Sequence, residues 1–301
     1  MKKTTQQPGF WTYLVIALSI VIGVLSANLK AEPTHFQVQV VGQGQPVLMI
    51  PGLMSDSRTW QPLQAELAAS YQLHLITLAG FAGNAPVNGP LLPKVREQLQ
   101  AYILSENLQQ PAIIGHSLGA FVAFDLASHQ PQLIGPVIAI DGLPYLAPVF
   151  TRSNQTQVRD MQAQASAIRS QYQQMSAQQL AAMAQHGLGI QASSQPHQQL
   201  VLEMASTSDP ASVGQALYEL LTTDLRQQIS AIQSPVLLLG ASGAITGDKE
   251  RQQIEQLYRQ QLAELPQARL AFHPQSRHFM TLDQPEWVAH HILTALKEAS
   301  Q

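Results

Sequence analysis

The chain has 301 residues, of which 45% are hydrophobic and 12% charged, and its formal net charge is −3. A chain of this length and apolar content can bury one large core and still carry an inserted subdomain. Lysine and arginine are scattered and form no basic patch, so nucleic acid is not an expected partner. The sequence contains no cysteine, which excludes disulfides, a cysteine nucleophile and thiolate metal sites. None of the motifs requires a cofactor.

The first thirty residues form a segment of their own. Two lysines at positions 2 and 3 precede an apolar run over 10–25, and small residues follow at 26–27. This order predicts a signal peptide over residues 1–30, cleaved after position 27, because the run is short for a spanning helix. The alternative is an uncleaved N-terminal anchor. In either case we expect an exported protein, periplasmic or secreted, whose only membrane contact is this segment if it is not removed.

The remaining chain alternates strand and helix patterns. Polar and apolar residues alternate over 36–40, as in a half-buried strand, and the continuous apolar run at 47–50 is typical of a central strand. A segment rich in glycine and proline at 80–93 predicts a loop. The other expected elements up to residue 140 are helices at 60–69, 95–104 and 118–129, and strands at 73–76, 112–114 and 137–140.

This alternation is interrupted over 144–232, where the pattern is helical and rich in Ala, Gln and Met. It resumes with strands at 236–239 and 269–272 and helices at 249–263 and 285–297. We therefore expect an α/β fold with a mostly parallel central sheet, helices on both faces and an all-helical lid inserted between two strands. The expected core is 34–143 with 233–300, and the expected lid is 144–232.

The most informative motif is Gly115-His116-Ser117-Leu118-Gly119. It lies between a predicted strand and a predicted helix, which is the setting of a nucleophile elbow. In such an elbow the turn is so tight that larger side chains at the glycine positions would collide with the strand and the helix. Ser117 is therefore the candidate nucleophile. The alternative interpretation is an ordinary Ser/Gly turn.

The order of elements and three motifs resemble the α/β-hydrolase family over residues 36–298. The motifs are Pro51-Gly52-Leu53, the elbow, and the segment His278-Phe279-Met280-Thr281-Leu282-Asp283-Gln284-Pro285. Residues 78–83 also resemble a subgroup of periplasmic or secreted hydrolases. The resemblance implies a serine hydrolase whose oxyanion hole uses the N–H groups of Leu53 and Leu118. Pro51 stands where many relatives have histidine, which leaves the backbone donor unchanged.

His278 is the candidate general base. It falls in the loop between the last predicted strand and the last predicted helix, and in α/β-hydrolases the order along the chain is Ser, acid, His. His273, at the end of that strand, is the rival. His290 and His291 lie on a predicted helix with no third ligand nearby, so we expect no metal site there.

The candidate acid departs from the family pattern. Relatives usually carry it in a G-x-x-D turn after the strand that follows the lid, but here the turn over 240–243 ends in Gly243. Asp141, at the end of the strand over 137–140, is the preferred acid, since some relatives use that position; its other interpretation is a structural aspartate. Asp248 is the alternative acid, although it also suits a helix cap. The absence of any acid is the third possibility.

Two further expectations concern a helix cap and the substrate. Asp283 is expected to cap the last helix. Lid methionines, among them Met183, together with Leu53, Met54 and Phe81 favour a small-to-medium hydrophobic acyl or alcohol group, although such methionines also serve as ordinary packing.

The sequence therefore predicts a serine hydrolase that cleaves an ester or thioester through an acyl-enzyme on Ser117. One alternative is a catalytically weak ligand-binding protein of the same fold, which the glycine at position 243 motivates. Another is a perhydrolase or a carbon–carbon hydrolase on that fold.

Overall fold

A computed structural model of the chain describes residues 34–299. The predicted signal peptide or anchor at 1–30 lies outside the described residues. Residues from 34 onward form one unit. Within 34–299, no helix combines the length and the hydropathy that a membrane span requires.

Seven strands form one sheet in the order β1-β3-β2-β4-β5-β6-β7. The edge strand β1 runs antiparallel to β3, and every other neighbouring pair is parallel. Parallel pairs need crossover connections, which the intervening helices provide. The strands are β1 (Phe36–Val41), β2 (Gln45–Ile50), β3 (Tyr71–Leu78), β4 (Ala112–His116), β5 (Val137–Ile140), β6 (Val236–Ala241) and β7 (Arg269–His273).

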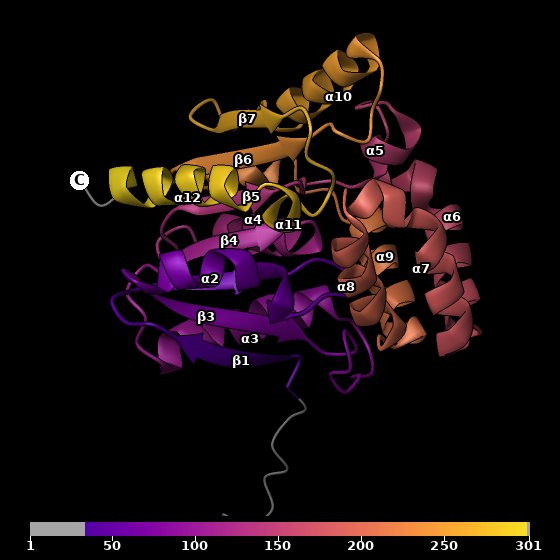
Figure 1. The fold of residues 1–301 in the computed structure, drawn as a ribbon, viewed down its shortest axis with the longest axis horizontal. Coiled ribbons are helices and arrows are strands. Elements are labelled where there is room, and N and C mark those ends of the chain that lie inside the picture. Colours follow the sequence, from indigo (N-terminus) through magenta and orange to yellow (C-terminus); the bar gives the residue numbers. More distant parts are fainter. Residues whose placement is uncertain (1–33, 300–301) are drawn as a thin grey trace, which may run out of the picture. The chain divides into compact units, whose positions relative to one another are not determined.

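Helices cover both faces of this sheet (Figure 1). Alternate residues of a strand point to opposite faces, so β2 sends Val47 and Met49 to one core cluster and Leu48 and Ile50 to the other. The expected α/β architecture is therefore confirmed. The helices of the first face are α2 (Gln61–Ala68) and α12 (Pro285–Ala299), and those of the second are α3 (Leu92–Ser105), α4 (Leu118–His129) and α10 (Asp248–Gln261).

A helical lid separates β5 from β6. Its main helices gather at the end of the sheet toward which the parallel strands point (Figure 1). This is the edge where parallel α/β proteins place their ligands, because loops from several strands meet there. The lid contains α5 (Ala147–Thr151), α6 (Val158–Gln173), α7 (Ala177–Gln191), α8 (Gln195–Ser206), α9 (Pro210–Thr222) and the 3-10 turn η2 (Gln228–Ala231).

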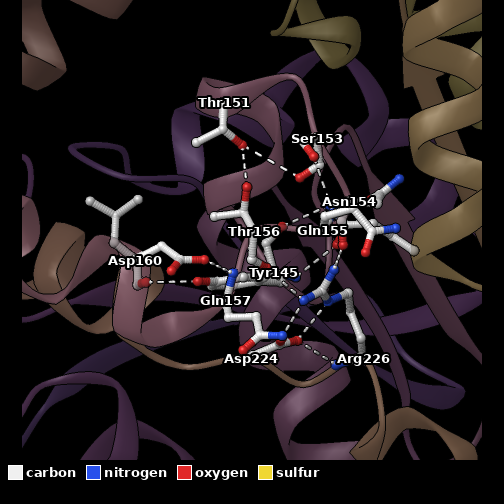
Figure 2. Close-up of polar contacts among 12 residues, drawn as sticks. Tyr145, Thr151, Ser153, Asn154, Gln155, Thr156, Gln157, Asp160, Asp224 and Arg226 are labelled. Carbon is white, nitrogen blue, oxygen red and sulfur yellow. Dashed lines mark hydrogen bonds and ion pairs between the residues drawn. The ribbon is translucent and has the colours of Figure 1, made fainter.

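A polar cluster around Arg226 joins the beginning and the end of the lid (Figure 2). The guanidinium donates to the carbonyl oxygens of Asn154 at 2.6 Å and Thr156 at 2.9 Å. It also pairs with Asp224, with Nη2 and Oδ2 2.6 Å apart, and lies 4.9 Å from the centre of the Tyr145 ring. Since planar Arg can satisfy several acceptors at once, a single side chain fixes both ends of the insert.

Glu219 of α9 ties the lid to the core. Its buried carboxylate accepts hydrogen bonds from the N–H groups of Leu91 at 2.9 Å and Leu92 at 2.7 Å. These groups lie at the start of α3, where a helix has unsatisfied donors and favours negative charge. A lid side chain therefore acts as the acceptor for the first turn of a core helix.

The observed elements depart from the expected ones at three places. The helix expected at 60–69 opens with a 3-10 turn, η1 (Ser57–Trp60), before α2 begins. Helix α3 begins at Leu92, inside the predicted loop at 80–93, because a proline is tolerated in the first helical turn. The short helix α11 (Met280–Asp283) was not expected, since four residues are too few to show a periodic pattern.

We expect Glu219→Gln to lower the free energy of unfolding by about 1–3 kcal/mol. The neutral amide can accept from one of the two N–H groups, but its own NH2 would face the other. Urea denaturation measures the change. Glu264→Gln is the matched control, because Glu264 is exposed and its substitution should stay within about 0.5 kcal/mol. Equal stabilities of the two variants would contradict this account of the lid contact.

Candidate active site

Ser117 occupies a strained turn between β4 and α4. Its backbone has φ 54° and ψ −114°, a conformation that costs on the order of 1–3 kcal/mol and persists only where the surroundings enforce it. A Cβ on Gly115 would overlap the carbonyl of Gly119, and one on Gly119 would overlap the carbonyl of Ile50. Both glycines are therefore required by the close approach of strand and helix, as the motif predicts.

The backbone at 52–53 passes directly beside this turn. A Cβ built on Gly52 would lie 2.9 Å from Nδ1 of His116 and 3.2 Å from Cβ of Ser117, so a larger residue here would crowd the elbow. Leu53 follows immediately, and Leu118 opens α4, where the first N–H groups have no acceptor within the helix. Leu53, Leu118 and Ser117 all line one cavity. The residues of the two expected oxyanion donors thus line the same cavity as the serine.

His278 is paired with Asp141. Nδ1 of the imidazole lies 2.7 Å from Oδ2 of the carboxylate. A carboxylate can only accept, so Nδ1 carries the hydrogen and Nε2 is left free to take a proton. The structure brings His278 and Asp141 together at the edge of the sheet that holds Ser117, and all three line the same cavity.

Two further donors hold the carboxylate of Asp141. Its Oδ1 accepts from the N–H of Ala241 and from the hydroxyl of Tyr258, each at 3.0 Å. Burial raises the pKa of Tyr258 well above its usual range, and the charge of Asp141 raises it further. The phenol therefore stays protonated and remains a donor. Sequence reasoning missed Tyr258, because a tyrosine in the last turn of a helix carries no signal of such a role.

The structure explains why residue 243 is a glycine. A Cβ at this position would overlap the backbone of Gln275, and the N–H of Gly243 donates to the carbonyl of Ser276 at 2.7 Å. The loop that carries His278 is therefore packed directly against the position where relatives usually place the acid. No side chain fits there, and Asp141 approaches the imidazole from the neighbouring strand instead.

Asp248, the alternative acid, is not brought to the site. It is the first residue of α10, its side chain is 91% exposed, and it lies 3.5 Å from the guanidinium of Arg251. The expectation that it caps a helix beginning at residue 249 is also wrong, since the N-cap is Gly247.

His116 contacts the backbone of the loop that carries His278. Its Nε2 lies 3.0 Å from the carbonyl oxygen of His278, and a carbonyl requires a donor there, so Nδ1 carries no hydrogen. Nδ1 is buried and is among the described side-chain atoms without a partner. Burial lowers the pKa of His116 well below its usual range, and His278 lowers it further. His116 is thus a neutral residue that positions the base, and its place inside the elbow motif was the only sequence signal for this role.

The lid also contacts the His278 loop through its backbone. The N–H of His278 donates to the carbonyl of Ile190 at 3.3 Å, and that of Phe279 donates to Gln191 at 2.8 Å. Residues 190–191 are the end of α7. The position of the imidazole therefore depends on the lid as well as on the sheet.

Asp283 strengthens this contact. Its carboxylate, fully buried, accepts from the N–H of Ser193 at 2.9 Å and from that of Arg277 at 3.0 Å. The expectation that Asp283 caps the last helix is wrong, because its oxygens are directed to the lid and to the His278 loop. A short polar residue before a helix suits a cap by sequence, and only the tertiary contacts show the other use.

The cavity beside Ser117 has a volume of about 670 Å³, which is within the range of small-molecule sites. Met54 and Met183 line it, as expected for contacts with a substrate. Met161 is buried in a cluster of the lid instead, and Met204 is buried in a cluster that the lid forms with Phe279 and Leu282. Phe81, expected in the pocket, is fully buried in the core cluster and is not among the cavity residues, because the turn after β3 directs it inward.

The other candidate histidines lie elsewhere. Nδ1 of His273 accepts from the N–H of Ser276 at 3.1 Å, and its ring packs against Trp287. His291 also packs on Trp287, at 4.0 Å between ring centres. Across the part of the chain that the structure describes, no group of three or more His, Asp or Glu residues is arranged to hold a metal ion.

Comparison with known proteins decides the family. The model of the Alpha/beta hydrolase family matches residues 47–291. The chain belongs to the alpha/beta hydrolase family. This membership agrees with the sheet order, the elbow and the lid described above, and the resemblance seen in the sequence is confirmed.

Several curated relatives are named as esterases. A pimeloyl-[acyl-carrier protein] methyl ester esterase of Vibrio vulnificus (strain CMCP6) is 22% identical over 268 residues, which are 86% of this chain and 96% of that protein. The same-named protein of Aeromonas salmonicida (strain A449) is 34% identical over 110 residues, covering 36% of this chain and 41% of its own length.

Solved structures share the fold of this hydrolase. A thermophilic esterase from Thermogutta terrifontis superposes with a TM-score of 0.73 at 18% identity, over 90% of this chain and 97% of that one. At this identity the likeness concerns the fold.

We expect His116→Gln to flatten the pH dependence of stability. The unfolded chain takes up a proton at His116 near about pH 6.5, whereas the folded protein resists it because the lowered pKa keeps the ring neutral. Stability from this residue is therefore present above about pH 6.5 and is lost as the pH falls below it. The Gln amide can still donate to the carbonyl of His278 but does not titrate.

Urea denaturation at about pH 7.5 and at about pH 5 measures this effect. Between the two values, the wild-type protein should lose about 1–2 kcal/mol more than the variant. Parallel pH profiles would show that His116 titrates normally in the folded protein.

Proposed function

We propose that this protein is a serine hydrolase that cleaves a carboxylic ester or thioester with a hydrophobic acyl or alcohol group. The observation that carries the proposal is the 2.7 Å contact between His278 and Asp141 on the wall of the cavity that also holds Ser117. In this proposal the core, residues 34–143 and 233–300, supplies the chemistry, and the lid, residues 144–232, surrounds the hydrophobic group. Export is also part of the proposal and rests on residues 1–30 alone.

The reaction follows from the roles of these groups. Nε2 of His278 takes the proton of the Ser117 hydroxyl as its oxygen attacks the carbonyl carbon. The negative oxygen of the tetrahedral intermediate is stabilised by the N–H groups of Leu118 and Leu53, each worth roughly 3 kcal/mol. Asp141 stabilises the imidazolium that forms.

The second half of the reaction returns the enzyme to its starting state. Protonated His278 gives its proton to the leaving alcohol or thiol, and an acyl-enzyme remains on Ser117. A water molecule then attacks the acyl carbon while His278 takes its proton. The imidazolium finally returns that proton to the Ser117 oxygen as the carboxylic acid leaves.

The cavity wall supports an uncharged, hydrophobic substrate. Apart from His116, His278 and Asp141, its ionisable groups are two tyrosines and Arg277, and the guanidinium of Arg277 donates to the lid carbonyl of Ala192 at 3.0 Å. The names of the two curated relatives described above, both methyl ester esterases, favour an ester as the scissile group.

The alternative of a non-catalytic binding protein was motivated by Gly243. The argument for this alternative is weaker in the structure, because Asp141, at the end of another strand, places a carboxylate within hydrogen-bond distance of His278. Perhydrolase and carbon–carbon bond cleavage would use the same residues, and none of the contacts described within 34–299 favours them over ester hydrolysis.

We expect Asp141→Asn to reduce kcat by about 10⁴-fold, because the amide can present an N–H to Nδ1 and favour the wrong tautomer of His278. The Asn oxygen can keep the bonds from Ala241 and Tyr258, so the thermal midpoint should change little. Asp248→Asn is the matched control and should leave kcat unchanged. Hydrolysis of p-nitrophenyl butyrate measures both variants. If Asp248→Asn were the damaging substitution, the acid would have to be reassigned.

A fluorophosphonate probe tests the nucleophile directly. We expect one covalent adduct on folded wild-type protein, located on Ser117 by peptide mass spectrometry, and none on Ser117→Ala. The same variant should lose all turnover on the ester. Absence of labelling on a protein with a normal thermal transition would reject the serine-hydrolase proposal, as would ester turnover that survives in Ser117→Ala.

A further inference from the structure

One face of the lid helix α7 forms a wall of the cavity beside Ser117. The wall residues follow a spacing of three and four, which places them on a single side of the helix. They are Leu180, Met183, Ala184, Gly187, Ile190 and Gln191. Gly187, which has no side chain, lies between larger residues of this face.

The wall is closed at one end and open at the other. Leu180 is fully buried, whereas Met183 is 38% exposed and Ile190 is 63% exposed. Gly187 lies between the latter two along the helix, and a Cβ built on it would meet no atom within 4 Å. Phe150, on α5, also lines the cavity and is 63% exposed. The cavity therefore reaches solvent among large apolar side chains.

This arrangement is unfavourable without an occupant. A glycine inside a helix is destabilising relative to alanine, and the exposed apolar side chains of Phe150, Met183 and Ile190 leave hydrophobic area in water. An apolar chain that passes between them would remove that area from water, which is favourable. A short substrate that ends near Ser117 would not reach this opening and would leave these side chains in water.

We propose that Gly187 determines specificity by leaving a notch through which an unbranched alkyl chain of the ester extends from Ser117 toward solvent. This inference rests on the proposed function and names its substrate class: esters whose acyl or alcohol part is a medium-to-long alkyl chain. The chain lies along α7 and covers Met183, Ile190 and Phe150 where they face the opening.

Gly187→Leu and the matched control Gly189→Leu test the notch. Both glycines lie on α7 and both have free space for a side chain, but only Gly187 lines the cavity. Leucine is a better helix former than glycine at either position, so neither variant should unfold. The substrates are p-nitrophenyl esters from acetate to decanoate, and acetates of alkanols from ethanol to decanol.

In the wild-type protein kcat/KM should rise with chain length in one of the two series, which tells whether the notch holds the acyl or the alcohol part. In that series Gly187→Leu should lower kcat/KM for the decyl substrate by about tenfold or more and leave the two-carbon substrate within about twofold. Gly189→Leu should match the wild type throughout. Equal losses on short and long substrates, or no loss on either, would overturn the notch.

Binding of 1-decanol, measured by calorimetry, separates failure of the notch from failure of the proposed function. If no ester is hydrolysed, the proposed function fails, but weaker decanol binding to Gly187→Leu than to Gly189→Leu still supports the notch. Equal decanol affinities of the two variants would refute the alkyl path along α7.

Discussion

The site depends on the carboxylate of Asp141 being held by three donors from three different parts of the chain. Ala241 contributes a backbone N–H from β6, Tyr258 a hydroxyl from α10, and His278 its Nδ1. With both oxygens engaged, the carboxylate has one orientation, and the imidazole that it bonds has one tautomer. A carboxylate at the end of β5 can therefore serve a histidine that comes from the loop after β7.

The lid takes part in this arrangement and does more than cover it. The carbonyls of residues 190 and 191 receive the N–H groups of His278 and Phe279, while Asp283 binds Ser193 and Arg277 across the same boundary. Elsewhere Glu219 completes the first turn of α3, and the Arg226 cluster closes the insert on itself (Figure 2). The loop of His278 is thus held from two sides, by the sheet through His116 and by the lid through α7.

Sequence was sufficient where function is tied to the order of elements. Ser117 could be found because a tight turn between a strand and a helix imposes glycines at fixed positions, and His278 because only one histidine follows the last strand in a loop. The strands were expected for a similar reason, since most are short apolar runs that stand out from the helices around them, and the antiparallel edge strand β1 shows an alternation of polar and apolar residues.

Sequence was insufficient where a role depends on contacts between distant segments. Tyr258 and the carbonyl of Ile190 carry no local signal, and Phe81 was expected in the pocket although packing after β3 turns it into the core. Asp283 resembles a helix cap by position, but the lid uses its carboxylate. Asp141 lies between these cases: its place at a strand end made it the preferred acid over Asp248, and the 2.7 Å distance to the imidazole supports that preference.

The packing at Gly243 also bears on how such a centre can change during evolution. One substitution could not place a carboxylate at residue 243, because there is no room for a side chain there until the backbone at 275–276 moves away. Moving the carboxylate from the end of β5 to this position would therefore require the loop that carries His278 to be rebuilt at the same time.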